Sequence, residues 1–539
     1  MNRWASSPQP SPPEEEREQT PVRYSGLRGS TRLTAAWLIA GAWLAASALC
    51  AAAAAPAGAP PQPDLPRLVP DYVGVTLPPN IAPLNFRIQE TGAAYRVELR
   101  STYGAPLSLS GRPASLRIPP QAWRSLLRAN PGQPFFWDIA VQKDRSGWTR
   151  FATVTNHIAS EEIDPYLSYR LIKPLFNAYL HVGLYQRNLE SFDQEPLLEN
   201  DQFDDGCLNC HTLLNRRPDT FAFNIRGYRG HHPMILVLSN RAARVERTMG
   251  YLAWHPSGRL LAFSANKLSL FFHTRAETRD VYDAASDLGI YRLDSDTVSF
   301  PPAIAAPDRN ETWPCWSPEG RYLYFSSAAP QPLDRFRHIR YDLMRVSYNL
   351  DTDQWGQPET MISSEAIGLS ICQPRVSPDG RFLLVTCCRY GNFPIYQANS
   401  DLYVMDLASR DLRRLPINSE QADSWHSWSS NSRWVVFSSK RIDGLFARPH
   451  FTYVDAQGEF HKPFVLPQQD PDFYASCLNT FNVPELMQGP VTISERELAR
   501  AVKQPRRLLT PQGPARPTGA GPKTGPSGGQ EQGGYPARE

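Results

Sequence analysis

Five consecutive residues, Cys207-Leu208-Asn209-Cys210-His211, form a C-x-x-C-H pattern. This spacing is the attachment pattern of a c-type haem, because each thiol forms a thioether with the haem and the adjacent histidine binds the iron. The pattern therefore predicts one covalent haem c, held by Cys207 and Cys210, with His211 as an axial iron ligand. Such a ligand helps to set the redox potential, so the chemistry we expect is electron transfer.

Other interpretations of these residues are a C-x-x-C disulfide, half of a zinc site and a chance match. No second Cys/His pair follows at the spacing of a zinc finger, which disfavours zinc. A thioredoxin-type motif requires a βαβ context, and the sequence around residue 207 does not provide one. Export from the cytoplasm favours the haem interpretation over these alternatives.

The other axial position of the iron has several candidate ligands. The two main candidates are His255, which lies in a turn, and His231, which lies in a loop between strands. Further candidates are His232, Met234 and Met249. If none of them binds, the iron is five-coordinate, and this favours small-ligand binding or a haem enzyme.

The N-terminus has the pattern of an export signal. Residues 1–32 are polar and end with several arginines, residues 33–55 form a continuous apolar run, and small residues and prolines follow. A basic flank, an apolar segment and small residues make a secretory signal. The run is also long enough for a membrane anchor, which needs about 20 residues. We therefore expect residues 1–55 to be a signal peptide or a membrane anchor, and the protein to lie in the periplasm or cell envelope.

The overall composition excludes some partners. The chain has 56 basic and 53 acidic residues, with a formal net charge of +3, which argues against nucleic acid as a partner. The expected partner is a redox protein or another cell-envelope protein. Proline is abundant, with 51 residues, and 11% of residues are aromatic, which indicates a β-rich protein with many turns.

The elements that must position the haem site form a repeat. A tight turn followed by an apolar strand recurs four times, with Pro-x-Gly supplying the turn in three copies. The turns are Trp254-His255-Pro256-Ser257-Gly258-Arg259, Trp316-Ser317-Pro318-Glu319-Gly320-Arg321, Val376-Ser377-Pro378-Asp379-Gly380-Arg381 and a decayed copy, Trp428-Ser429-Ser430-Asn431-Ser432-Arg433. A second half-unit, an alternating strand with an Asp/Ser/Gly turn and another strand, recurs between these copies. Each pair of half-units makes four strands, as in one propeller blade.

Counting half-units predicts six blades, with five or seven as the alternatives. The first half-unit missing before residues 234–248 falls on the haem motif, so we expect residues 207–211 at the turn of one blade. The last missing half-unit falls around residues 473–486 and is expected to pair with residues 182–198. This pairing would close the ring with both ends of the propeller.

The whole chain is predicted to be all-β. The predicted order is a signal or anchor (1–55), a linker (56–69), a β-sandwich-like domain with one helix near residues 120–129 (70–160), a propeller (161–490) and a disordered tail (491–539).

The Trp-Ser-Pro-Glu-Gly-Arg and Ser-Pro-Asp-Gly-Arg turns, each followed by an apolar strand, resemble the repeats of TolB-type bacterial β-propellers over roughly residues 180–486. The arrangement is also similar to exported bacterial proteins that combine a C-x-x-C-H site with such repeats. The resemblance implies a six-bladed propeller, a covalent haem and a periplasmic or cell-surface setting.

The resemblance implies no enzyme activity, because propellers host unrelated functions. The alternative to an electron-transfer cytochrome is a protein-binding or scaffolding propeller whose haem is structural or sensory. The chain departs from a small cytochrome c, since it has no helical cytochrome domain around His211 and no methionine at the usual downstream distance.

Overall fold

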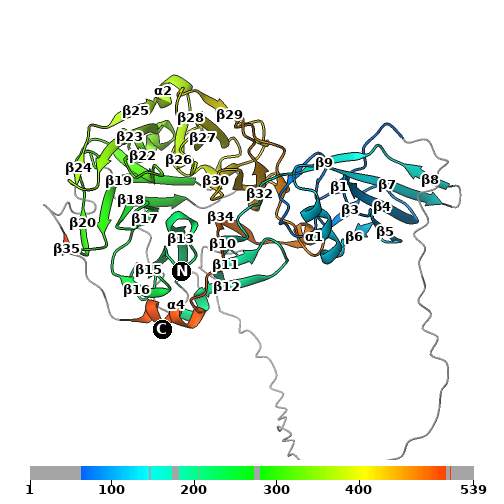
Figure 1. Cartoon of the computed structure of the whole chain (residues 1–539). Helices are drawn as coiled ribbons and strands as arrows, with labels where there is room; N and C mark the ends of the chain where they lie inside the picture. The colour runs from blue at the N-terminus through cyan, green and yellow to red at the C-terminus, as the bar shows by residue number, and fades with distance from the viewer. Residues whose placement is uncertain are drawn as a thin grey trace, which may run out of the picture. The chain divides into compact units, whose positions relative to one another are not determined.

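The computed structural model describes residues 62–144, 147–172, 181–203, 206–271, 280–504 and 510–511 (Figure 1). The predicted export segment, residues 33–55, lies outside these residues. Within them, no helix combines the length and the apolar character that crossing a membrane requires.

Six sheets, antiparallel except for the pair β20–β35, form the blades of a β-propeller, and this confirms the all-β fold (Figure 1). Blade 1 contains β34 (Thr480–Met487), β10 (Tyr166–Ile172), β11 (Val182–Asn188) and β12 (Gln194–Glu199). Blade 2 contains β13 (Cys207–Leu213), β14 (Phe221–Arg226), β15 (Met234–Leu238) and β16 (Arg241–Val245). Blade 3 contains β17 (Gly250–Trp254), β18 (Leu260–Phe271), β19 (Asp280–Arg292), β20 (Thr297–Ser299) and β35 (Thr510–Pro511).

The other three blades follow the same order of strands. Blade 4 contains β21 (Asn310–Trp316), β22 (Tyr322–Ala328), β23 (Asp342–Asn349), β24 (Gln354–Trp355) and β25 (Glu359–Ile362). Blade 5 contains β26 (Ser370–Val376), β27 (Phe382–Cys388), β28 (Asp401–Asp406) and β29 (Leu412–Arg414). Blade 6 contains β30 (Asp423–Trp428), β31 (Trp434–Ser439), β32 (Arg448–Tyr453) and β33 (Phe464–Val465). The first strand named in each blade is its innermost strand.

The ring is closed by strands from both ends of the propeller, as predicted, but with a different division of the strands. The C-terminal strand β34 pairs antiparallel with β10, with Tyr166 opposite Met487 and Ile172 opposite Thr480 (Figure 1). Only this innermost strand comes from the C-terminus, because Phe473–Ser476 form the short helix α3 instead of a strand. The second strand, β10, lies before residues 182–198 and was not expected.

The repeated turns join the innermost strand of a blade to the next strand. Gly258, Gly320 and Gly380 adopt φ between 73° and 77°, which glycine adopts without steric cost. In the decayed copy Ser432 takes this position at φ 61°. The turn therefore forms without Pro-x-Gly, although the serine adopts a left-handed backbone conformation that is sterically unfavourable for a residue with a side chain.

Residues before the propeller form two further sheets. One contains β1 (Leu68–Val69), β3 (Phe86–Ile88) and β6 (Ser115–Leu116). The other contains β2 (Thr76–Leu77), β9 (Val154–Ile158), β7 (Pro134–Asp144), β4 (Ala94–Ser101), β5 (Leu107–Gly111) and β8 (Gly147–Arg150). The predicted helix is present as α1 (Pro120–Ala129). Phe86 stacks on Trp137 at 4.9 Å, and their buried cluster continues into Trp434 and Phe451 of blade 6.

Two predicted unstructured segments contain secondary structure. Strand β1 lies in the predicted linker, because the apolar residue Leu68 pairs with Ile88 as soon as the proline-rich stretch ends. The prediction of a disordered tail from residue 491 was wrong for α4 (Glu495–Lys503), which begins with a capping box of Ser494 and Glu497. Leu498 and Val502, spaced four residues apart, bury the apolar face of this helix against blades 1 and 2.

Candidate functional site

The haem motif lies in the innermost strand of blade 2. Residues 207–211 belong to β13, where Cys207 is opposite Arg226 and His211 is opposite Phe223, with a bulge between Asn209 and His211. The expectation that the motif occupies a blade turn was wrong. The turn after this strand is the 3-10 segment η3 (Leu214–Arg216), which replaces Pro-x-Gly.

The two thiols are free and face different neighbours. Cys207 is buried, and its Sγ lies 3.3 Å from the Arg170 guanidinium on β10. Cys210 packs against a cluster of residues at the centre of the propeller, and burial raises the pKa of its thiol. Cys210 is the residue that the bulge between Asn209 and His211 adds to the strand, so regular alternation is interrupted there and the two thiols contact different neighbours.

The His211 imidazole is buried between blades 1 and 2, with 4% of the residue exposed. Its Nε2 lies 2.9 Å from the Ser168 hydroxyl of β10. Burial, with a smaller contribution from Arg170, lowers its pKa to about 3, so the ring is neutral at pH 7. Its Nδ1 is buried and has no hydrogen-bond partner in the described part of the chain.

The residues of the motif have the chemistry that a c-type haem requires. A neutral imidazole with one nitrogen held by a hydrogen bond and the other unpartnered is in the form that binds a metal. The two free thiols complete the donor set of a c-type haem, so the chemistry of the residues fits the group. The strand conformation directs the two thiols to different neighbours. Both thiols could therefore reach one edge of the porphyrin only if the first residues of β13 changed their backbone conformation.

The structure gives the two main candidate sixth ligands other partners. His255 Nδ1 lies 2.7 Å from the Ser257 hydroxyl, and Nε2 lies 3.1 Å from the Gly320 carbonyl of blade 4. Its ring therefore faces the blade on the side away from the motif. His231 pairs with Glu246, at 3.0 Å, in the loop between β14 and β15. That loop follows Arg226, which is opposite Cys207, so it lies at the same end of the blade as Cys207. The expectation that the motif occupies a turn had placed this loop at the opposite end of the blade from the motif.

An aromatic cluster fills the centre of the propeller beside Cys210. Four innermost strands place a residue with positive φ there: Tyr251, Trp313, Trp425 and Val483, with φ between 42° and 56°. Each lies at a bulge in its strand. Tyr251 stacks on Trp313 with ring centroids 3.6 Å apart, and Trp313 meets Trp425 edge-on at 5.1 Å. We call these four residues and Cys210 the channel cluster.

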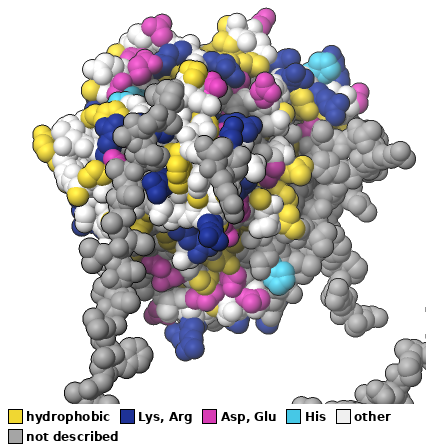
Figure 2. All heavy atoms as spheres, turned by 90° about the vertical axis from the view of Figure 1, so that its right-hand side faces the viewer, with side chains coloured by type: hydrophobic (Ala, Val, Ile, Leu, Met, Phe, Trp, Pro, Cys, Tyr) yellow, Lys and Arg dark blue, Asp and Glu magenta, His cyan; other side chains and the backbone are white. Residues whose placement is uncertain are grey.

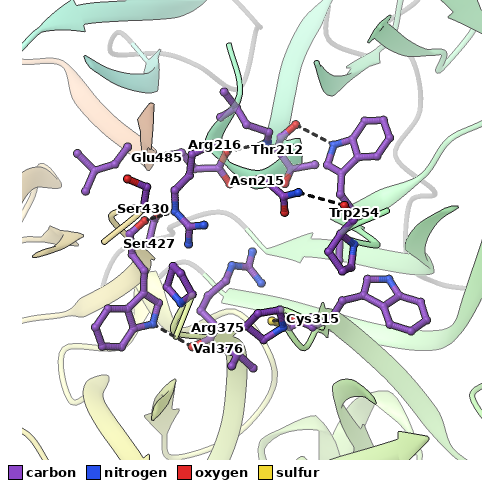
Figure 3. A pocket seen from close by; sticks show the side chains of 18 of the residues that line it. Thr212, Asn215, Arg216, Trp254, Cys315, Arg375, Val376, Ser427, Ser430 and Glu485 are labelled. Carbon is purple, nitrogen blue, oxygen red and sulfur yellow. Dashed lines mark hydrogen bonds between the residues drawn. The ribbon is translucent and has the colours of Figure 1, made fainter. Parts of the chain in front are cut away.

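A cavity of about 400 Å³ opens at the ends of all six innermost strands (Figure 3). Its walls include Thr212, Trp254, Cys315, Arg375, Trp428 and Glu485, one from each strand, and the prolines of the repeated turns are at its rim. Arg216 of η3 and Arg375 of β26 both extend their guanidinium groups into it (Figure 3). We call it the mouth cavity.

The charged side chains that line the mouth cavity are two arginines and one glutamate, and the Asp164 carboxylate accepts hydrogen bonds from Ser430 of its wall. Arg216 Nε donates to the Trp428 carbonyl at 2.7 Å, and an Arg375 terminal nitrogen donates to the Pro374 carbonyl at 2.9 Å. Glu485 accepts from the Leu213 N–H at 3.2 Å. Burial raises the Glu485 pKa to about 7, although Arg375 and Arg216 act in the opposite direction.

Sequence reasoning missed this second site. Arg375 and Glu485 each interrupt an otherwise buried innermost strand. A charged residue in such a strand was the sequence feature that could have indicated a site. Its relation to a binding site is evident only from the closed ring, which places both residues at one cavity.

No protein-family model matches the sequence, and no curated protein matches it. Among solved structures, TolB from Acinetobacter baumannii is 13% identical over 66% of this chain and 79% of that chain, with a TM-score of 0.39. Hydrazine synthase of Kuenenia stuttgartiensis is 12% identical over 57% of this chain and 47% of that chain, with a TM-score of 0.36. The Dos1 propeller is 13% identical over 49% and 62% of the two chains, with a TM-score of 0.31. The six-bladed fold of this chain follows from its own strand pairing.

Proposed function

We propose that this chain is an exported β-propeller that binds one haem c through Cys207 and Cys210, with His211 as an axial iron ligand, and that it transfers electrons. The observation that carries the proposal is the His211 imidazole, which is buried, neutral and unpartnered at Nδ1 among the described residues. A buried polar atom without a partner costs free energy, so it requires an explanation. A metal bond to this nitrogen supplies one.

Residues of the neighbouring blade prepare this histidine. The Ser168 hydroxyl lies 2.9 Å from Nε2 and fixes the orientation of the ring. The Arg170 guanidinium beside Cys207 disfavours the imidazolium form of His211, which cannot bind a metal. When bound, the haem supplies one-electron redox chemistry.

Haem attachment requires a local change in β13. Both thioethers must reach one porphyrin edge, while Cys207 and Cys210 face Arg170 and the channel cluster in this structure. We expect the first residues of β13 to leave the strand conformation in the loaded protein. Hydrogen exchange of residues 207–210 in haem-loaded and haem-free protein tests this expectation.

The partner that we propose is a redox protein of the periplasm or cell envelope, reached by way of the export segment at residues 33–55. Lysine, arginine, aspartate and glutamate are interspersed on the face shown in Figure 2, which is consistent with the near-balanced charge of the chain. This surface has little resemblance to a nucleic-acid interface, which concentrates positive charge.

The test is expression in a host that exports proteins and attaches haem to C-x-x-C-H sites. We expect haem that stays on the chain in a denaturing gel, a mass increase of one haem, and none of either in the Cys207→Ala/Cys210→Ala variant. Cys477→Ala is the matched control, because it removes a thiol outside the motif. Folded, exported wild-type protein without covalent haem would refute the proposal.

A second candidate function is a binding propeller with a structural or sensory haem. The mouth cavity favours it, because an open cavity with two arginines that form no described ion pair has the features of a ligand site. A titration with redox mediators separates the two. Electron transfer requires iron that is reduced and reoxidised reversibly, whereas a structural haem that stays in one oxidation state would favour the binding function.

A further inference from the structure

We propose that the mouth cavity is a binding site for a carboxylate, held by Arg216 and Arg375. The site is separate from residues 207–211, none of which lines the cavity. The proposal therefore does not depend on haem attachment. It concerns a ligand that the six innermost strands enclose together.

Two guanidinium groups, those of Arg216 and Arg375, enter the mouth cavity together (Figure 3). In the described part of the chain, Arg216 and Arg375 each donate to a backbone carbonyl, and neither residue forms an ion pair. Arg375 also forms a side-chain hydrogen bond with the Cys315 thiol. Arginine carries five N–H donors, so most donors on each group remain for a ligand. Burial lowers the Arg216 pKa, which shows that its charge is partly removed from water. A bidentate oxyanion is the partner that best compensates such a group.

The charge of the cavity favours a carboxylate over a phosphate. Arg216 and Arg375 carry two positive charges, and the Asp164 carboxylate, which is hydrogen-bonded to Ser430 of the cavity wall, offsets one of them. The Glu485 pKa is raised to about 7, so protonation of this side chain leaves one positive charge uncompensated. A carboxylate carries one negative charge and matches this excess, whereas a doubly charged phosphate exceeds it.

The cavity combines an apolar rim with polar side chains in its walls. Its rim is formed by half-buried prolines of three repeated turns, Pro256, Pro318 and Pro378, and tryptophans lie behind them. Polar donors deep in a cavity with apolar rings at its rim suit a carboxylate on an apolar body. Two sources have this chemistry: the propionates of a haem attached nearby, and a free ligand such as the C-terminus of a protein.

The experiment uses N-acetyl-leucine as the carboxylate probe and its C-terminal amide as the uncharged twin, with calorimetric titration of the full chain. We expect the acid to bind haem-free Cys207→Ala/Cys210→Ala protein at least 10-fold more tightly than the amide does. Arg216→Gln and Arg375→Gln, each in that background, should weaken the acid at least 10-fold. Arg321→Gln is the control, because this arginine is exposed on a repeated turn and does not line the cavity.

The haem-loaded protein distinguishes the two sources. If the loaded protein no longer binds the acid, the haem propionates occupy the arginines; if it still binds, the natural ligand is a separate carboxylate. Equal binding of acid and amide, no binding to the haem-free protein, or stronger binding of inorganic phosphate would overturn the proposal. Failure of haem attachment refutes the proposed function alone, because the haem-free titration does not need it. Melting temperatures of the arginine variants show whether each remains folded.

Discussion

The Ser168 hydroxyl oxygen lies 2.9 Å from the His211 Nε2, and this contact joins β10 of blade 1 to β13 of blade 2. Both residues are buried, and they stand more than forty positions apart in a ring whose closing strand comes from the other end of the chain. The candidate iron ligand is thus oriented by a strand of the neighbouring blade, whose inner edge is paired only after β34 closes the ring. Packing of blade 1 against blade 2 and the orientation of His211 are coupled through this pair.

Acidification is expected to destabilise the fold through His211. Its folded pKa of about 3 lies below the ordinary 6.5, so the stability it contributes is complete above pH 6.5 and is lost as the pH falls towards 3. Between pH 7.5 and 5 the loss is about 2 kcal/mol. Urea unfolding of haem-free protein at pH 7.5 and 5 measures it, and His211→Gln should reduce the difference by this amount.

The matched control is His338→Gln, since His338 is exposed and should not alter the pH dependence. His426 and His450 also have lowered pKa values because they are buried, so the variant retains part of the acid sensitivity. An identical loss of stability in wild type and His211→Gln would contradict the neutral, buried state of this ring.

Truncation of the channel cluster is expected to cost much stability. Trp313 is 1% exposed, stacks on Tyr251 and donates from its indole to the Asn392 carbonyl at 2.9 Å. Trp313→Ala should lower the free energy of unfolding by about 3–5 kcal/mol, because it leaves a cavity where the innermost strands meet. Chemical denaturation measures this change. Tyr103→Ala, at a 59% exposed residue, is the control, and a similar small effect in both variants would argue against the cluster.

Closure of the ring is expected to depend on β34 and not on the residues after α4. A chain that ends at residue 504 keeps β34 and α4 and should unfold cooperatively, with a melting temperature close to that of the full chain. A chain that ends at residue 479 lacks the innermost strand of blade 1 and leaves the inner edge of β10 unpaired. We expect it to aggregate or to be degraded, as limited proteolysis and size-exclusion chromatography will show. A stable monomer of this shorter chain would contradict the closure.

Carboxylate binding in the mouth cavity is expected to weaken as the pH rises. The Glu485 pKa is raised to about 7, so this side chain is mostly neutral at pH 6 and negative at pH 8. It shares the cavity with Arg375 and Arg216 and accepts a hydrogen bond from the Leu213 N–H. N-acetyl-leucine should therefore bind haem-free protein several-fold more tightly at pH 6 than at pH 8. Glu485→Gln should bind equally at both values, and a persistent difference would assign the effect to another group.

The sequence was sufficient to predict the architecture because the repeat is local. Each tight turn with its following strand is specified within about ten residues, and four copies in phase require a ring of blades. The same reasoning predicted closure by the C-terminus. The repeat did not predict α3 or α4. Helix α3 has only four residues, and the apolar face of α4 consists of four buried residues within a mostly polar sequence.

The sequence by itself determined the all-β repeat and singled out Cys207, Cys210 and His211 as the residues of the predicted haem site, since two thiols and an imidazole at this spacing are the attachment pattern of a c-type haem. Only the tertiary structure decided that these residues lie in an innermost strand and not in a turn, with Ser168 against the histidine. It alone brought Arg216, Arg375 and Glu485 to one cavity. The physical reason is that these residues lie far apart in the chain, and their charges meet only when all six strands converge on a common axis.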